Sequence, residues 1–311
     1  MKIISTAVLL GITLLAIPFF TYYFGTALGV IEWKAIHTLI WVAIGFIVYC
    51  FIVGELTQNN SQVDKLWSII PVIYLWIIAY YSDFSPRLIL MAVMVTLWGI
   101  RLTTNFAMKG AYHWRFWAGE EDYRWQILRQ KPELNPKWKW ILFNLLFICG
   151  YQNTLILLFT LPSVIALQKV NTPLGITDYI AAGLMFIFIT MEMVADIQQW
   201  NFQSKKRAMI REGVNLTPDY EKGFLDRGLW AYSRHPNYFA EQIIWVCFYL
   251  FSVAASGQWF NWSISGCLLL ILLFQGSSSF SEEISSGKYP AYKVYQQQVS
   301  RFFPFFRIRR S

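Results

Sequence analysis

Long apolar runs alternate with short polar segments along the whole of this chain. A transmembrane helix needs about 20 predominantly apolar residues to cross roughly 30 Å of hydrocarbon. Eight runs approach that length and the last two are short, so the pattern predicts an all-α, polytopic bundle of about seven or eight spans. The predicted spans are Ile3–Phe24, Ala35–Gly54, Leu66–Tyr81, Leu88–Phe106, Trp140–Ala166, Thr177–Trp200, Phe239–Ala255 and Trp262–Gly276.

Composition supports a membrane protein and argues against a soluble one. Hydrophobic residues make up 56% of the 311 residues and charged residues only 14%, whereas soluble proteins carry about 25% charged residues. The 15 Trp, 17 Tyr and 25 Phe residues suit the headgroup region of a membrane, where aromatic rings concentrate. We therefore expect one integral, multi-pass membrane domain over residues 1–311, in a bacterial inner membrane or in the endoplasmic reticulum.

The positive charge orients the predicted bundle. The net charge is +8, and most cations lie in the tail and in the loops between spans four and five and between spans six and seven. Only Lys34, Arg87 and Lys169 fall in loops on the other side. Because Lys and Arg favour cytoplasmic loops, both termini are expected in the cytoplasm. Cations scattered in this way predict no nucleic-acid partner, and the four cysteines lack CxxC or CxxH spacing, so no metal site is expected.

Two acidic residues lie inside the sixth predicted span, where ionisable groups are costly. Glu192 and Asp196 are four residues apart, so both carboxylates fall on one helix face and repel each other. Burial in a polar site that faces the bundle is favoured over carboxylates that merely reach the membrane surface. The pair is therefore a candidate ligand-binding site.

A denser polar cluster opens the seventh span, in the segment DRGLWAYSRHPNYFAEQ. Pro236 suits the first turn of a helix, where its missing N–H costs nothing. The free N–H groups of such a helix start favour anions, and Arg227 and Arg234 add donors suited to phosphate. Asn237 and Glu241 are one turn apart and face the same way. A simple helix cap with solvated charges is the alternative.

Two further groups are weaker candidates. Asp64 and Arg101 lie at the cytoplasmic ends of predicted spans, and they either pair with each other or take part in catalysis. Beyond the eighth span, Glu282 and Glu283 lead into an aromatic and basic tail, which is either a membrane-surface helix or part of a site. The motifs GxGxxG, GxxxxGKS/T and GxSxG do not occur, so any nucleotide must be held by membrane helices and their loops.

Several of these segments together resemble the steroid 5-alpha-reductase-like superfamily. The run GLWAYSRHPNYFAEQ follows EMVADIQQWNF and precedes YPAYKVYQQQVSRFFPFF, and the first half contains VDKLWSIIP and LWGIRLTTNF. The narrower similarity is to the branch known only as steroid 5-alpha reductase family enzymes. The resemblance covers residues 60–305, leaves residues 1–60 outside it, and places a cofactor site within residues 190–300.

The resemblance implies a membrane-embedded oxidoreductase of the CH–CH class, which uses NADPH to reduce a C=C bond in a lipid or steroid-like substrate. In that family a Pro-Asn followed by Glu contacts the nicotinamide end of the cofactor, and the matching residues here are Asn237 and Glu241. The family's Asp in the sixth span matches Asp196, whereas Glu192 stands where the family has Asn. The candidate cofactor-binding residues are Glu192, Asp196, Arg227, Arg234, His235, Asn237, Tyr238, Glu241 and Glu283.

Departures from that family keep the substrate open. Where characterised reductases carry His and Tyr before the last Tyr-Pro, this chain has SSSFSEE at residues 277–283. The Glu–Tyr pair that polarises a steroid carbonyl in those enzymes has no secure match here. Asp64 and Arg101 are the candidate catalytic residues, and the expected partners are membrane lipid and a small lipophilic substrate.

The same end of the chain also resembles isoprenylcysteine carboxyl methyltransferases and phospholipid methyltransferases. The matching positions include Arg234, His235, Glu282 and Glu283. In that alternative the bound species is S-adenosylmethionine, the acceptor is a prenyl group or phospholipid, and Glu283 lies near the cofactor or acceptor. A transporter or scaffold without catalysis is a third alternative.

Overall fold

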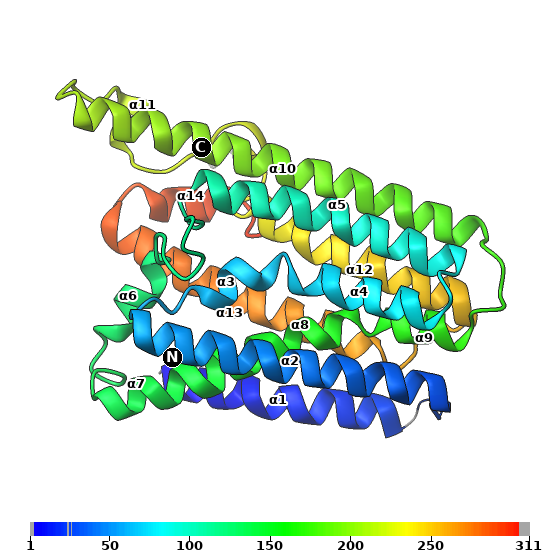
Figure 1. Cartoon of the computed structure of the whole chain (residues 1–311). Helices are drawn as coiled ribbons and strands as arrows, with labels where there is room; N and C mark the ends of the chain where they lie inside the picture. Colours follow the sequence, from blue (N-terminus) through cyan, green and yellow to red (C-terminus); the bar gives the residue numbers. More distant parts are fainter. Residues whose placement is uncertain (1–2, 24, 26, 305–311) are drawn as a thin grey trace. The chain divides into compact units, whose positions relative to one another are not determined.

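The computed structural model describes residues 3–23, 25 and 27–304, which are largely helical (Figure 1). Eight helices or stacks of consecutive helices are long and apolar enough to cross a membrane. This confirms the predicted all-α, multi-pass membrane protein. The crossing segments are α1 (Ile3–Tyr23), α2 (Val30–Thr57), α3 (Gln62–Trp67) with α4 (Ile70–Tyr81), α5 (Pro86–Met108), α7 (Lys137–Phe143) with η1 (Asn144–Tyr151), α8 (Gln152–Thr160) and α9 (Pro162–Gln168), α10 (Ile176–Arg211), α12 (Pro236–Ser256) and α13 (Ile264–Lys288).

Some residues used in the prediction lie outside the described part of the chain. They include Phe24, which closes the first predicted span, and the orienting cations Lys2, Arg307, Arg309 and Arg310. The cytoplasmic location of both termini stays a prediction.

The chain divides into two compact units. Unit 1 comprises Met1–Met185 and Trp245–Leu270, and unit 2 comprises Phe186–Ile244 and Ile271–Ser311. Helices α10, α12 and α13 contribute residues to both units. The single domain expected over the whole chain therefore stays a prediction.

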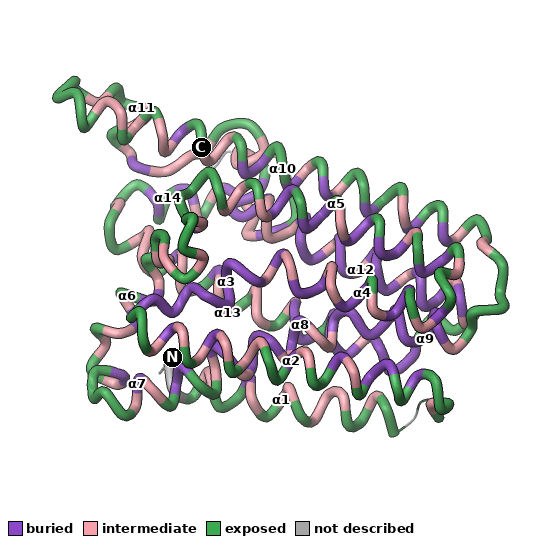
Figure 2. The backbone as a smooth tube through the Cα atoms, viewed as in Figure 1, coloured by how far each residue is buried: buried purple, intermediate pink, exposed green. Residues whose placement is uncertain are grey.

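In unit 1, α4 and α5 form a tight helical hairpin, and α4 also packs on α2, α8 and α9. The residues that connect the two helices, Asp83 and Phe84, adopt left-handed backbone conformations, and Pro86 then starts α5. The close approach requires Gly99, because a Cβ there would lie 2.6 Å from the Ser68 carbonyl oxygen. Many residues of α1 are exposed (Figure 2), and they include the apolar side chains of Val8, Leu9, Ile12 and Leu15, as expected for a helix that contacts lipid.

A buried ion pair joins the starts of α5 and α10 within unit 1. The Arg87 guanidinium donates to both carboxylate oxygens of Asp178, at 2.8 and 3.0 Å. Its remaining donors reach the Thr172 hydroxyl and the Thr172 and Pro173 carbonyl oxygens. Both charged side chains are buried and fully hydrogen-bonded, which is the arrangement that a buried charge requires.

The third span begins at Gln62, four residues before the predicted start, so it includes polar residues of the segment NNSQVDK. These side chains bind successive carbonyl groups of the loop that follows α5. Lys65 donates to the Phe116 and Ala118 carbonyl oxygens, and Gln62 donates to that of Trp117. Partners for these polar groups come from a distant loop, which explains why a pattern of apolar residues placed the boundary too late.

Unit 2 contains the second part of α10, α11 (Pro218–Glu221), the short helix η2 (Gly228–Ala231) and α14 (Tyr292–Gln298). Helix α10 continues to Arg211 because the charged run after Trp200 consists mainly of good helix formers. Helix α13 continues 12 residues beyond the predicted end at Gly276. The Ser278 and Ser279 hydroxyls donate back to the Gln275 carbonyl oxygen, which satisfies them within the helix.

Candidate functional site

A group of acidic and amide side chains forms where α10 and α12 meet in unit 2. Pro236 is the first residue of α12, as predicted, so Asn237 lies in the first turn. The Asn237 side-chain amide donates to Asp196 Oδ1 at 3.2 Å. Its own oxygen, Oδ1, is buried and has no hydrogen-bond partner among the residues that the structure describes.

Two further carboxylates lie one turn away from this hydrogen bond. The contacts Phe188–Phe239 and Asp196–Asn237 run in opposite order along the two helices, so α10 and α12 are antiparallel here. Glu192, one turn before Asp196, and Glu241, one turn after Asn237, therefore lie on the same side of the Asp196–Asn237 hydrogen bond. We call Glu192, Asp196, Asn237 and Glu241 the acceptor cluster, and its three carboxylates are all buried.

The acceptor cluster can bind groups that donate hydrogen bonds. Carboxylates and an amide oxygen offer lone pairs only, and an unpaired buried acceptor costs about 1–3 kcal/mol. A ligand amide, hydroxyl or ammonium group would satisfy it. No group of three or more His, Cys, Asp or Glu suited to a metal ion occurs among the described residues.

An open cleft of about 380 Å³ follows on the next turns of α10. Stacked rings of Phe202 and Tyr220, 5.0 Å apart, form part of its wall, and Lys205 lies 5.8 Å from the Tyr220 ring. The cations of the cleft are Lys205, Lys222 and Arg227; Lys222 pairs with Asp226, and Arg227 pairs with Asp219. We call this the cationic cleft.

The loop that borders the cationic cleft is fastened to α10. Gly228 has a φ of +61°, and a Cβ there would lie 2.5 Å from Gln198 Oε1. Gln198 accepts a hydrogen bond from the Leu229 backbone N–H at 3.0 Å, and the Trp230 indole donates to the Ala195 carbonyl oxygen at 3.1 Å. These contacts hold the cleft against the same helix that carries the acceptor cluster.

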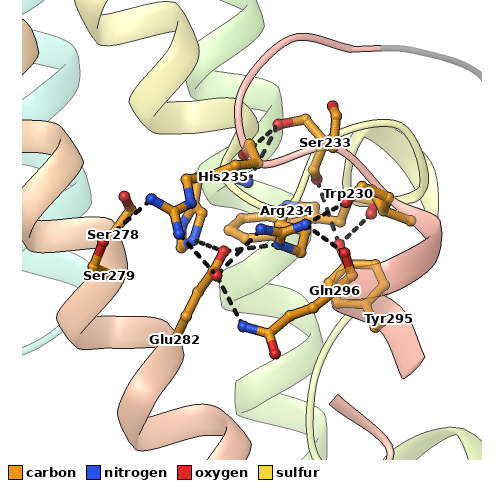
Figure 3. Close-up of polar contacts among 12 residues, drawn as sticks. Trp230, Ser233, Arg234, His235, Ser278, Ser279, Glu282, Tyr295 and Gln296 are labelled. Atoms are coloured by element: carbon orange, nitrogen blue, oxygen red, sulfur yellow. Dashed lines mark hydrogen bonds and ion pairs between the residues drawn. The ribbon is translucent and has the colours of Figure 1, made fainter. Parts of the chain in front are cut away.

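A third group centres on the buried carboxylate of Glu282 (Figure 3). Arg234 donates to both of its oxygens, at 2.7 and 3.2 Å, and His235 Nε2 lies 3.0 Å from Oε1. Gln296 donates to Oε2 at 2.9 Å, and an Arg301 nitrogen lies 3.7 Å from the same oxygen. We call this set the Glu282 network.

The Glu282 network gives Arg234 and His235 a structural role. Arg234 also donates to the carbonyl oxygens of Gln296 and Val299, so four of its five N–H donors are used inside the protein. Little of this guanidinium remains for the phosphate that the sequence predicted it would bind. His235 stacks on Tyr238 at 5.2 Å, which fixes the orientation of that candidate residue.

Of the adjacent acids, Glu282 is buried and Glu283 is exposed. Glu283 is the residue predicted to bind a cofactor, but the central position in the network belongs to its neighbour Glu282. Ser278 and Glu282 are four residues apart, so they share one face of α13. Both side chains are buried, which makes this the inner face of the helix.

The tail after α13 folds back onto unit 2. The backbone N–H groups of Arg234 and His235 donate to the carbonyl oxygens of Ser300 and Arg301, at 2.9 and 3.1 Å. The Tyr295 hydroxyl donates to the Trp230 carbonyl oxygen. The tail therefore packs on the segment that carries the candidate residues Arg234 and His235; its part in a binding site stays a prediction.

The candidate catalytic residues Asp64 and Arg101 lie in unit 1. Both side chains are buried, and Asp64 accepts a hydrogen bond of 2.7 Å from the Trp125 indole. Their mutual ion pair and their catalytic role stay predictions.

These features define a multi-pass helical membrane protein with a buried polar site beside a cationic cleft. The chain belongs to the family described as "Protein of unknown function (DUF1295)", which matches residues 50–299 and is related to steroid 5-alpha-reductase-like proteins. It is 40% identical over 259 residues to the "Uncharacterized protein C594.04c" of Schizosaccharomyces pombe (strain 972 / ATCC 24843). The aligned region covers 80% of this chain and 73% of that protein. No solved structure matches the chain.

Proposed function

We propose that this chain is a membrane-embedded, NADPH-dependent oxidoreductase that reduces a C=C bond in a lipid or steroid-like substrate. The observation that carries the proposal is the acceptor cluster, with the unpartnered Asn237 oxygen in it, on the same helix as the cationic cleft. Membership of a family related to steroid 5-alpha-reductase-like proteins supports the same class of reaction.

The chemistry of the two parts fits NADPH. The nicotinamide carboxamide and the ribose hydroxyls donate hydrogen bonds, which the acceptor cluster can accept. The phosphates are anions, and Lys205 contacts no carboxylate among the described residues, so it is the cation most available to them. Asp196 and Lys205 are separated by about 14 Å along α10, at 1.5 Å per residue, a length that one dinucleotide can cover.

Each residue then has a defined task. Asn237 and Glu241 orient the nicotinamide end, Asp196 holds the Asn237 amide in place, and Lys205 with Arg227 holds phosphate. When bound, NADPH supplies the hydride. The reaction also requires a proton from an acid; Asp64, which accepts a hydrogen bond from the Trp125 indole within unit 1, stays a candidate from the sequence alone.

One observation favours a second candidate function, methyl transfer from S-adenosylmethionine. The acceptor cluster carries three carboxylates, and these suit the ammonium and sulfonium groups of that cofactor. S-adenosylmethionine has no phosphate, however, and its single carboxylate accounts for less of the cationic cleft than the several phosphate charges of NADPH. We therefore favour NADPH.

A thermal-shift assay on detergent-purified protein tests the proposal, with NADPH, NADP⁺, NADH and S-adenosylmethionine at matched concentrations. A ligand present at about 100 times its Kd stabilises the folded state by about 2.7 kcal/mol. We expect stabilisation by NADPH and NADP⁺ but not by S-adenosylmethionine. Stabilisation by S-adenosylmethionine alone would establish the alternative, and no shift with any of the four would refute both.

Two variants locate the site. Asn237→Ala and Glu241→Gln should lose the NADPH shift while the protein stays monodisperse, because both changes remove acceptors from the cluster. The matched controls Asn215→Ala and Glu212→Gln make the same chemical changes at exposed positions of unit 2 and should keep the full shift. If all four variants respond alike, NADPH does not bind at the acceptor cluster.

A further inference from the structure

Two lysines converge on one tyrosine at the ends of α10 and α13, within unit 2. Lys206 donates to the Tyr289 hydroxyl at 3.3 Å and lies 4.9 Å from the centre of its ring. Lys288 lies 5.4 Å from the centre of the same ring. The other contact of the Lys206 ammonium is the Gly223 carbonyl oxygen, at 3.4 Å. Among the described residues, neither ammonium group pairs with a carboxylate.

The tyrosine is held in place between the two cations. Gly223 has a φ of +87°, and a Cβ there would lie 2.0 Å from the Tyr289 ring, so the ring packs directly on the backbone. Tyr289 also packs against the buried cluster of Tyr292, Tyr295 and Val299. Lys206 and Lys288 therefore both contact a ring that is held in place by its packing.

The positive field at this position is strong enough to act on the tyrosine itself. Burial raises the pKa of the Tyr289 phenol, but hydrogen bonds and charge from Lys206 and Lys288 outweigh burial and hold the pKa below its ordinary value. An anion at this position is therefore stabilised, and the residues that the structure describes supply no carboxylate to provide it.

The depth of the two lysines matches the headgroup region of a membrane. Helix α13 has 25 residues and ends at Lys288, which gives a length of about 38 Å at 1.5 Å per residue. That length is greater than the roughly 30 Å of hydrocarbon and smaller than the roughly 40–45 Å thickness of the membrane with its headgroups, so one end of the helix reaches the headgroups. Along α10, Lys206 is about 45 Å from Ile176, and a tilt of about 20° shortens this distance along the membrane normal.

We propose that Lys206, Lys288 and Tyr289 form a binding site for the phosphate group of an anionic membrane lipid. The phosphate oxygens accept hydrogen bonds from the two ammonium groups and the phenol, and the negative charge compensates the two cations. The site is distinct from the cationic cleft, because Lys206, Lys288 and Tyr289 are not among the residues that line the cleft and Lys206 is rotated by about 100° from Lys205 around α10. The proposal does not depend on the proposed enzymatic function.

The test uses the full-length protein in a neutral detergent, with bound lipid counted by native mass spectrometry. Soluble short-chain phosphatidylglycerol is titrated into the parent and into the double variant Lys206→Gln/Lys288→Gln. Each lysine near an anionic headgroup contributes about five-fold to binding, so the double variant should bind about 30-fold more weakly. Zwitterionic phosphatidylcholine of the same chain length should bind weakly to both proteins.

Two variants keep the test interpretable. The matched control Arg211→Gln/Lys293→Gln removes the same charge from exposed positions of unit 2 and should bind phosphatidylglycerol like the parent. Tyr289→Phe keeps the ring on Gly223 but removes one donor, so it should show a smaller loss than the double variant. If the double variant and the control lose binding equally, only net charge matters and the proposal is wrong.

Two further arms separate the sources of phosphate. Inorganic phosphate at the same concentrations should fail to compete with the lipid; effective competition would show a site for free phosphate and overturn the lipid assignment. The double variant should keep the full thermal shift with any cofactor that stabilises the parent. Loss of that shift would assign the two lysines to the cofactor and would also overturn the proposal.

Discussion

Replacement of Glu282 by Ala should be among the most destabilising single changes in unit 2. The carboxylate is 3% exposed and accepts hydrogen bonds from Arg234, His235 and Gln296. Its removal leaves the Arg234 guanidinium, itself only 9% exposed, as a buried charge without its partner. Such a loss costs about 3–5 kcal/mol, and we expect the low end because the half-buried Arg301 can admit water.

The free energy of unfolding can be measured by titration with SDS in mixed micelles, followed by circular dichroism at pH 7. Glu283→Ala is the matched control, because it removes the same group from an exposed neighbour and should change stability by less than about 0.5 kcal/mol. Arg234→Met should destabilise by a similar amount to Glu282→Ala. The double variant should cost much less than the two single changes together, because neither charge is then left alone.

Two results would refute this reasoning. The first is a cost below about 1 kcal/mol for Glu282→Ala, which would mean that the carboxylate is exposed to water or does not bind Arg234. The second is simple additivity of Glu282→Ala and Arg234→Met, which would show that the two side chains stabilise the protein independently.

Three further predictions concern other parts of the chain. Arg87→Met should destabilise by about 3–5 kcal/mol, because it leaves the Asp178 carboxylate buried without its partner; a thermal unfolding temperature equal to that of the parent would contradict this. Asp122→Ala should cost about 1 kcal/mol and loosen the start of α6 (Tyr123–Arg129), because the Asp122 carboxylate accepts a hydrogen bond of 2.9 Å from the Arg124 backbone N–H. Unchanged amide hydrogen exchange in α6 would contradict this. Burial raises the pKa of Asp122, but the charge and hydrogen bonds of Arg124 outweigh burial and lower the pKa. The stabilisation by this pair is therefore present above about pH 4 and is lost as the pH falls through the lowered pKa. If the parent and an Asp122→Asn variant have identical acid unfolding curves, the pair contributes nothing.

Much of the fold could be predicted because the membrane imposes a simple requirement on the sequence. An apolar run of sufficient length has few alternatives to a spanning helix, so eight runs led to eight helical spans. The boundaries were less predictable where polar residues continue a helix. The segment SSSFSEEISSGK extends α13 because serine hydroxyls bind its own carbonyl groups and Glu282 finds cationic partners. Those partners come from residues about 50 positions away, which no local pattern reveals.

The candidate site could be predicted in part for the same reason. Glu192 and Asp196 on one helix face, and Asn237 one turn before Glu241, follow from helical spacing alone, and the structure brings Asp196 and Asn237 together. Helical spacing does not say which of the adjacent acids Glu282 and Glu283 faces inward. Nor does it show that the Arg234 guanidinium donates to the Gln296 and Val299 carbonyl oxygens, because those contacts depend on how the tail folds back.

The contact between Arg234 and the tail sets an order on the synthesis of the protein. Arg301 follows Arg234 by 67 positions (301 minus 234), and a ribosome that adds about 5–20 residues per second needs roughly 3–13 s to cover them. During that interval the later helices can already enter the membrane, while the start of α12 has neither Glu282 nor the Ser300 and Arg301 carbonyl groups as partners. A newly made chain therefore passes through a stage in which it is inserted but its site region is unfinished, and this is when a membrane protease or chaperone would find it most accessible.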